Sequence, residues 1–265
     1  MKRQKIIKRN KRTAELVGLS LGDGGLTNGN TRNSMRFQLR GNLTEDREHY
    51  DNYIIPLFNK EVMIPLFKRK VGIVSNKNKG FYGLSVQSIK IEKNLNWIGI
   101  PSGVKRELFI PYWIKNNKKN SISFLRGLFD TDGTVCCQKN YSIKNPLLHT
   151  KIKIDITITS KNLIKEVSII LNRLRIKNLI KKPYKWKNKN WRVFHRVTID
   201  GGINVINWFK IIGSKNPKHI TKFDVWKRFG YCPPYTNLIE RKEMLKKGVI
   251  PDFYYMRECR SGQTS

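Results

Sequence analysis

Acidic residues, cysteines and long apolar runs are all scarce in this chain. Of its 265 residues, 53 are Lys or Arg and only 19 are Asp or Glu, giving a net charge of +34 and a pI near 10.3. Such a field concentrates polyanions, and nucleic acid is the commonest polyanion inside cells. Because no apolar run is long enough for a spanning helix and no basic amphipathic helix dominates, we expect no membrane partner.

The four cysteines form no recognisable framework. Cys136 and Cys137 are adjacent, whereas Cys232 and Cys259 stand alone, so neither a disulfide pattern nor a CxxC zinc pattern is present. The basic start "MKRQKIIKRNKRT" also lacks the apolar stretch of a signal peptide. We therefore expect inert thiols and an intracellular, reducing location, either a prokaryotic cytoplasm or an organelle matrix.

One segment of the chain occurs twice. The stretch "LVGLSLGDGG" from Leu16 is repeated in shape by "FLRGLFDTDGTV" from Phe124, which aligns Gly18 with Gly127 and Asp23 with Asp132. Both stretches predict helices that end on Asp-Gly, with Thr13 and either Ser121 or Ser123 as N-caps. An internal repeat of this length predicts two similar structural halves.

The segments after each motif also correspond. "SMRFQLRG" and "TKIKIDITIT" alternate polar and apolar residues as half-buried strands do. They are followed by predicted helices, "LTEDREHYDNYIIPLF" capped by Thr44 or Asn42, and "SKNLIKEVSIILNRL" capped by Ser160. We therefore predict an α+β fold with two pseudo-symmetric αββαββα halves, residues 1–116 and 117–231. "KNNKKNS" at 115–121 is the expected linker, and 232–265 form a C-terminal helix and a disordered tail.

Stripes of small residues run along both motif helices. Ala14, Gly18 and Gly22 lie four apart in the first helix, and Ser123, Gly127 and Thr131 occupy the second. Small side chains allow two helices to approach closely, so the stripes either form a seam between the halves or pack against their own sheets. The repetition favours the seam.

A seam would bring together the two aspartates at the helix ends. Two carboxylates there would repel each other and the negative helix ends, unless a cation lay between them. Mg²⁺ prefers such oxygen ligands and activates water toward a phosphodiester. A lone Asp-Gly is usually only a helix stop, but two copies in the same context favour a metal site. Asp130 aligns with Leu21, so a pseudo-symmetric site leaves Asp130 structural or peripheral.

Both motifs resemble the signature of the LAGLIDADG homing endonucleases in their single-chain, two-motif form. "LVGLSLGDG" and "LRGLFDTDG" match most of its nine positions, and the order of strands and helices fits from about Thr13 to Phe229. The resemblance implies a monomeric, site-specific double-strand DNA endonuclease, intron-encoded or free-standing, with a saddle of strands on a long pseudo-palindromic site. It implies Mg²⁺ as cofactor, with Mn²⁺ or Ca²⁺ able to substitute for binding.

The implied site residues follow from the motif positions. Asp23 and Asp132 are the implied catalytic metal ligands, with Gly22 and Thr131 beside them in the metal site. A lysine after the third helix of each half is implied near the scissile phosphates. Lys105 is the candidate in the first half, and Lys218 is favoured over Lys215 and Lys222 in the second.

Polar residues on the predicted strands are candidates for DNA contact. A β-ribbon in the major groove can read base edges, for which Arg suits guanine and Gln suits adenine, while further basic residues contact phosphates. The candidate DNA-binding residues are Arg32, Arg36, Gln38, Arg40, Lys68, Lys70, Lys151, Lys153, Asp155, Thr157, Lys185, Lys187, Arg192 and Arg196.

Three other interpretations remain. "FDTDGTV" alone is similar to the nucleophile loop of haloacid-dehalogenase-type phosphatases, but the preceding residues are not strand-like and the first motif would have no role. An intein lacks support because the chain has neither a nucleophile at its start nor a His-Asn pair at its end. An RNA maturase that binds intron RNA, or a non-cleaving DNA-binding regulator, could use the same scaffold, although both aspartates are retained.

Overall fold

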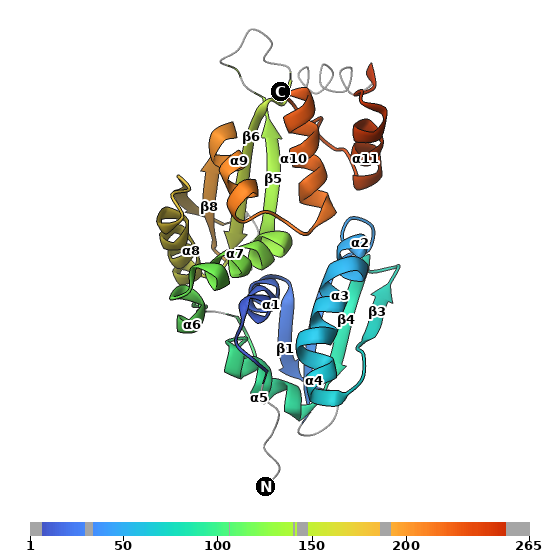
Figure 1. Cartoon of the computed structure of the whole chain (residues 1–265), viewed down its shortest axis with the longest axis vertical. Helices are drawn as coiled ribbons and strands as arrows, with labels where there is room; N and C mark the ends of the chain where they lie inside the picture. The colour runs from blue at the N-terminus through green and yellow to red at the C-terminus, as the bar shows by residue number, and fades with distance from the viewer. Residues whose placement is uncertain are drawn as a thin grey trace.

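The two halves of the chain have the same order of helices and strands (Figure 1). The computed structural model describes residues 7–29, 34–105, 107–139, 141, 148–185 and 192–252. The first half contains α1 (Lys11–Gly22), β1 (Gly24–Asn28), β2 (Met35–Asn42), α2 (Arg47–His49), η1 (Tyr50–Ile54), α3 (Ile55–Phe58), η2 (Asn59–Met63), α4 (Ile64–Phe67), β3 (Gly72–Asn76), β4 (Phe81–Gln87) and α5 (Ile89–Ile98). The rest contains α6 (Tyr112–Lys115), α7 (Lys118–Asp132), β5 (Gly133–Gln138), β6 (Lys151–Ile158), α8 (Lys161–Arg173), β7 (Leu179–Tyr184), β8 (Phe194–Asp200), α9 (Gly202–Ile211), α10 (Pro217–Phe229) and α11 (Leu238–Lys247).

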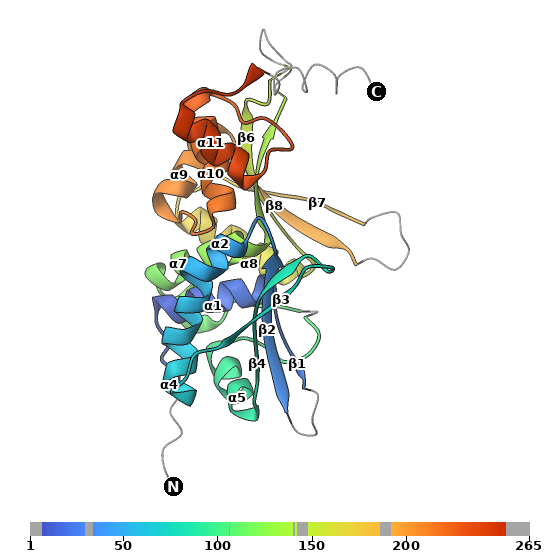
Figure 2. The ribbon, with the colours of Figure 1, turned by 90° about the vertical axis from the view of Figure 1, so that its right-hand side faces the viewer.

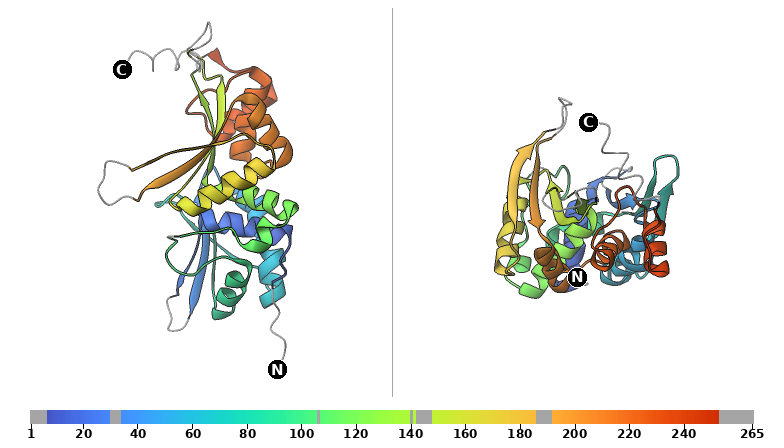
Figure 3. Two further views of the ribbon diagram at one scale, coloured as in Figure 1. Left: turned by 90° about the vertical axis from the view of Figure 1, so that its left-hand side faces the viewer. Right: turned by 90° about the horizontal axis from the view of Figure 1, so that it is seen from above.

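Each half has one antiparallel sheet of four strands. The orders are β1-β2-β4-β3 and β5-β6-β8-β7, so the topology is repeated, and the predicted αββαββα pattern is confirmed. The helices of both halves lie on one side of the molecule and the strands on the other (Figure 2). The β3–β4 and β7–β8 hairpins stand on opposite sides when the molecule is seen from above (Figure 3). Apolar residues such as Phe37 and Ile154 point from the sheets into the core.

Helices α1 and α7 form the seam between the halves. A Cβ on Gly18 would lie 2.2 Å from the Phe124 carbonyl oxygen, and one on Gly127 would lie 2.2 Å from the Glu15 carbonyl oxygen. The two backbones therefore touch where the glycines are, and the predicted seam is confirmed. The alternative, in which each stripe packs on its own sheet, is excluded.

A buried ion pair crosses the same seam. The Arg126 guanidinium of α7 donates to both carboxylate oxygens of Glu15 in α1, at 2.9 and 2.6 Å, and Tyr53 donates to the same carboxylate at 2.7 Å. Glu15 is almost fully buried, so this two-point contact fixes the angle between the helices as well as their distance.

The predicted starts of the two motif helices, α1 and α7, are wrong. Asn10 caps α1 in a capping box with Thr13, so Thr13 is inside the helix. Asn117 caps α7 through Asn120 N, so the expected linker at 115–121 mostly forms the first turn of that helix. The hydrophilic composition of residues 115–121 resembles that of a linker because this helical turn is exposed to solvent. Ser160 caps α8 as predicted.

The second helix of the first half is longer than predicted. It runs from Arg47 to Phe67 and includes the two π-helical stretches η1 and η2, one before each "IPLF" segment. Pro56 and Pro65 lack an N–H, and the wider turns before them accommodate that loss. Asn42 accepts from the backbone of Thr44 and Glu45, and Asp46 takes the N-cap position.

The connection between the halves is anchored to the second half. Leu108 N donates to Ser160 Oγ at 3.0 Å, and Ile110 N donates to Glu166 of α8 at 2.6 Å. None of the helices in the described ranges is long and apolar enough to cross a membrane. Arg32, Lys187, Cys259 and the predicted tail lie outside the described residues.

Candidate metal and nucleic-acid site at the seam

Asp23 and Asp132 meet at the C-terminal ends of α1 and α7. Asp23 is the C-cap of α1, and Asp132 is the last residue of α7. A Cβ on Gly22 would lie 2.0 Å from Thr131 Oγ1 and 3.1 Å from Asp132 Oδ2, so the helix ends are in contact. The close packing of α1 and α7 therefore places the carboxylates of Asp23 and Asp132, one from each half, next to each other.

Both carboxylates hold their protons more tightly than usual. Burial, followed by the charge of Asp46, raises the pKa of Asp23 to about 6. Burial, followed by the charge of Asp23, raises the pKa of Asp132 to about 7. The two acids are thus buried and repel each other, and a bound cation would offset both effects.

The positive charge of Lys105 lowers the pKa of both Asp23 and Asp132. Its ammonium donates to the carbonyl oxygens of Ser20, Leu21 and Gly22 at 2.7, 3.0 and 2.7 Å. It therefore caps the negative end of α1, beside Asp23. Burial lowers the pKa of Lys105 to about 8, against the opposing attraction of the two aspartates.

The second half uses a different set of residues at the equivalent place. Asn216 Nδ2 donates to the Asp130 carbonyl of α7 at 3.1 Å, where the first half has the Lys105 ammonium. Lys218 Nζ instead contacts Asp46 Oδ1 at 2.8 Å. The two predicted lysines are both brought to the seam, but they have different partners.

Asp130 is fully buried and holds the segment that leads to α10. It accepts from Ser214 Oγ at 2.5 Å and from Lys215 N at 2.9 Å, and His49 Nε2 lies 3.7 Å away. Burial lowers the pKa of His49 to about 3, so this contact is made by a neutral imidazole. The contacts of Asp130 therefore join α7 to the segment before α10 and to His49 of the first half.

The donor atoms present suit a hard divalent cation. No cluster of three or more His, Cys, Asp and Glu side chains that could hold a metal occurs in the described part of the chain. Two carboxylates with further oxygens from backbone, water or phosphate match what Mg²⁺ accepts. The Gly22 carbonyl already accepts from Lys105, and the Thr131 hydroxyl donates to Leu128 O at 3.0 Å, so Asp23 and Asp132 are the stronger candidates.

The predicted DNA-contacting residues on the strands are linked across neighbouring strands. Arg36 Nη2 donates to Gln87 at 3.3 Å, and Arg196 Nε donates to Thr157 Oγ1 at 3.1 Å. Such contacts order polar side chains on the outer face. Gln38 and Arg40 in β2 and Lys153 in β6 are half-buried there, whereas Lys151 in β6 is exposed.

Asp155 differs from the other strand candidates. Its carboxylate is buried, accepts from Thr198 at 2.6 Å and lies 3.2 Å from Lys153 Nζ and 3.7 Å from Arg196 Nη1. It therefore sets the positions of its basic neighbours. Lys68 and Lys70 are exposed between α4 and β3, and Lys185 and Arg192 are exposed beside β7 and β8.

Asp46 and Asn216 are functional candidates that no sequence pattern indicated. Asp46 lies in "LTEDREHY", which looks like an ordinary helix start, and nothing in that pattern indicates a partner in the other half. Asn216 precedes Pro217, a typical N-cap signal, and it does cap α10. Its side-chain amide nitrogen, however, donates both to Asp130 O and to Asp46 Oδ1, at 3.1 and 2.9 Å.

Comparisons with known proteins agree with this architecture. The model of the LAGLIDADG-like domain family matches residues 119–213. A structure of mesophilic variants of the homing endonuclease I-DmoI is 21% identical, with a TM-score of 0.52 over 76% of this chain and 90% of that chain. I-DmoI in complex with DNA and Mn is 21% identical, with a TM-score of 0.51 over 77% and 96%. An I-DmoI variant with its target DNA in the presence of Mg is 20% identical, with a TM-score of 0.51 over 76% and 95%.

A search of curated protein sequences finds no match. The likeness to I-DmoI covers about three quarters of this chain and shows a common fold. Residues 119–213 therefore match the LAGLIDADG-like domain family, and the chain as a whole has the fold of the homing endonuclease I-DmoI.

Proposed function

We propose that this protein is a monomeric, site-specific double-strand DNA endonuclease that uses a divalent metal, with Mg²⁺ as the natural ion. The observation that carries the proposal is the meeting of Asp23 and Asp132 at the ends of α1 and α7, where burial raises the pKa of both. A basic strand surface on the opposite side from the helices supports DNA as the partner. A long, pseudo-palindromic target suits two sheets related in this way.

Each group at the seam has a separate task in the proposed reaction. Asp23 and Asp132 would hold the metal, one from each half. When bound, a divalent cation activates water and stabilises the leaving oxygen of a phosphodiester. Lys105 holds positive charge beside both acids and keeps the end of α1 in place. Lys218, at the start of α10, supplies the second positive charge near Asp23.

The strand residues would position the DNA. Arg36, Gln38 and Arg40 of β2 would contact one half-site, and Lys151, Lys153 and Thr157 of β6 the other. Arg196 of β8, held by Asp155, would add to the second half-site. Arginine pairs with guanine and glutamine with adenine in the major groove, so each half would read a different sequence.

The proposal is tested with DNA that joins the sequences flanking this chain's own reading frame. A supercoiled plasmid carrying that junction is incubated with the protein and Mg²⁺, with a chelator as control, and cut ends are sequenced. We expect one double-strand break inside the junction and none with chelator. Intact plasmid together with tight binding of the intervening RNA would contradict the proposal and support an RNA maturase.

A further inference from the structure

Asp46 belongs to the first half, but two of its partners are in the second. Its Oδ1 accepts from Lys218 Nζ at 2.8 Å and from Asn216 Nδ2 at 2.9 Å, and its Oδ2 accepts from Asn42 N at 2.9 Å. The Asp46 side chain is about one-tenth exposed. All three contacts are with donors, so the carboxylate connects the turn before α2 directly to the first turn of α10.

The charges of this contact favour an ionised pair. Burial by itself would raise the pKa of Asp46, but the Lys218 charge and the hydrogen bonds from Lys218 and Asn216 outweigh it and lower the pKa. Asp46 and Lys218 also act in opposite directions on the pKa of Asp23, the first raising it and the second lowering it. The pair is therefore close enough to Asp23 to influence the proposed site.

The residue next to Asp46 is held by the C-terminal helix. Glu45 Oε1 accepts from Leu238 N at 2.9 Å, and Glu45 Oε2 accepts from Arg241 Nη2 at 3.1 Å. Arg241 is fully buried, and its Nε donates to Thr221 Oγ1 of α10 at 3.0 Å. One arginine of α11 thus joins the turn at Glu45 and Asp46 to the same helix that begins near Lys218.

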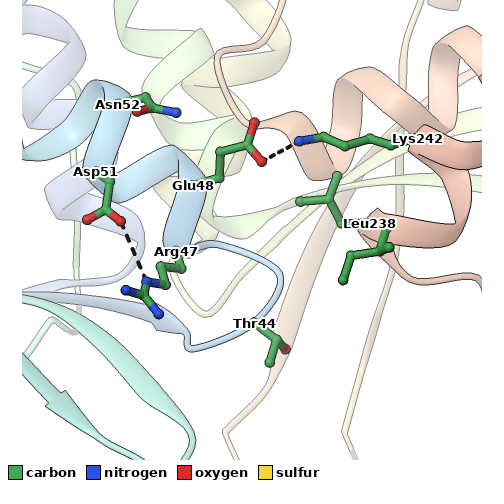
Figure 4. A pocket seen from close by; sticks show the side chains of 8 residues that line it. Thr44, Arg47, Glu48, Asp51, Asn52, Leu238 and Lys242 are labelled. Carbon is green, nitrogen blue, oxygen red and sulfur yellow. Dashed lines mark hydrogen bonds and ion pairs between the residues drawn. The ribbon is translucent and has the colours of Figure 1, made fainter. Parts of the chain in front are cut away.

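A second, exposed ion pair lies at the edge of this interface. Glu48 of α2 and Lys242 of α11 face each other and form a short ion pair (Figure 4). A cavity of about 330 Å³ lies around them, lined also by Thr44, Arg47 and Leu238. The Glu48–Lys242 pair is exposed and makes no contact with Asp46, which makes it a matched control.

We propose that Asp46 is a positioning residue for Lys218, and that α11, through Arg241 and Glu45, holds the turn that carries it. This inference rests on the proposed endonuclease function. Lys105 is fixed by carbonyls of its own half, whereas Lys218 is fixed by an acid of the other half. The two cleavage centres therefore differ, and loss of Asp46 affects the cutting of one DNA strand more than the other.

The test is strand-resolved cleavage of a supercoiled target plasmid by Asp46→Asn, Lys218→Met, the double variant and Glu48→Gln. Asp46→Asn keeps the size of the side chain but removes its charge. We expect it to slow one strand by about tenfold or more, as misplacement of a positioned group does, so that nicked circles accumulate. The double variant should be no slower than Lys218→Met alone, and Glu48→Gln should behave as the wild type.

Cleavage of both strands by Asp46→Asn at wild-type rates would overturn the inference. A double variant whose cleavage rate is reduced by the product of the two single reductions would also overturn it. Thermal unfolding and metal-free DNA binding are measured in parallel. If Asp46→Asn does not fold, Glu45→Gln serves instead, and we expect it to slow the same strand by a smaller factor. Equal slowing of both strands would then contradict the proposal.

If the wild type cuts no DNA, the proposed endonuclease function is wrong. The contact between Asp46 and Lys218 is then tested without cleavage. The Lys218 ammonium is followed by ¹⁵N NMR in the wild type, Asp46→Asn and Glu48→Gln. We expect its resonance to move in Asp46→Asn only. An unchanged ¹⁵N resonance of Lys218 in Asp46→Asn would show that the two side chains are not in contact.

Discussion

At the scale of single residues, the site is defined by acids whose protons are unusually tightly held. Asp23 and Asp132 have raised pKa values of about 6 and about 7 because they are buried near other acids. A metal ligand must be deprotonated, so metal binding competes with these protons. Metal affinity should therefore fall as the pH falls, because protons then occupy the carboxylates.

The first prediction concerns this pH dependence in the wild type. Above the raised pKa values both carboxylates are charged and bind metal freely, whereas below them protons must first be released. We expect the apparent Mg²⁺ affinity to fall as the pH drops through about 7 and 6, with release of protons on binding. Calorimetry in buffers of different ionisation enthalpy measures both. An affinity that is constant over this range would contradict the assignment.

The second prediction concerns Lys105. Its charge lowers the pKa of both aspartates, so Lys105→Met should raise those values and move the acid limb of the Mg²⁺-binding profile to higher pH. The variant also loses three hydrogen bonds to the end of α1, which should cost about 1 to 3 kcal/mol of folding free energy.

Lys119→Met is the control for Lys105→Met. Lys119 is exposed in the first turn of α7, at the opposite end from Asp132, and its removal changes the net charge equally. Its pH profile should match that of the wild type. An identical shift in both variants would mean that the effect comes from the overall charge of the protein and not from Lys105.

At the scale of elements, the close packing of α1 and α7 decides where the acids meet. The third prediction is that Gly127→Ala lowers the free energy of unfolding by about 1 to 3 kcal/mol, because the added Cβ would overlap the Glu15 carbonyl oxygen. Gly72→Ala in β3 is the control, since nothing lies within 4 Å of its Cβ position. Chemical denaturation compares the two, and equal stabilities would argue against a backbone-to-backbone seam.

The elements were largely predictable because their signals are local and repeated. Period-two alternation around Arg36 and Lys153 predicted the strands, and the repeated stripes of small residues on the two motif helices predicted the seam. The errors concern helix starts: the exposed turn after Asn117 has the composition of a linker, and the π-helical stretches before Pro56 and Pro65 have no recognised sequence signal. The site was half predictable. Asp23 and Asp132 follow from the repeated motifs and Lys105 from the family resemblance, but Asp46 depends on a contact between the halves that no local pattern encodes.

At the scale of the whole molecule, the two halves are joined by contacts that only the folded chain creates. The buried Glu15–Arg126 pair crosses the seam, and α11 of the C-terminal segment reaches back to Glu45 of the first half. These contacts make each half dependent on the other. They also fix the spacing between the two sheets, which sets where a bound duplex would meet the acids.

The fourth prediction follows from the buried pair. Glu15→Gln leaves the Arg126 charge without its counter-ion, and removing one partner of a buried pair typically costs about 3 to 5 kcal/mol. Arg126 is partly exposed, so we expect the lower end of that range, with both halves still unfolding in one transition. Calorimetric scans test this, and two separate transitions in the wild type would show that the halves are independent.

The most direct test of the two-carboxylate site compares the wild type with Asp23→Asn and Asp132→Asn on the target plasmid in Mg²⁺, with DNA binding measured in chelator. Both variants keep the shape of the side chain and lose its charge. We expect a double-strand cut by the wild type, no double-strand cut by either variant, and DNA affinity retained in all three. A variant that still makes the double-strand break would contradict a site shared between the two helix ends.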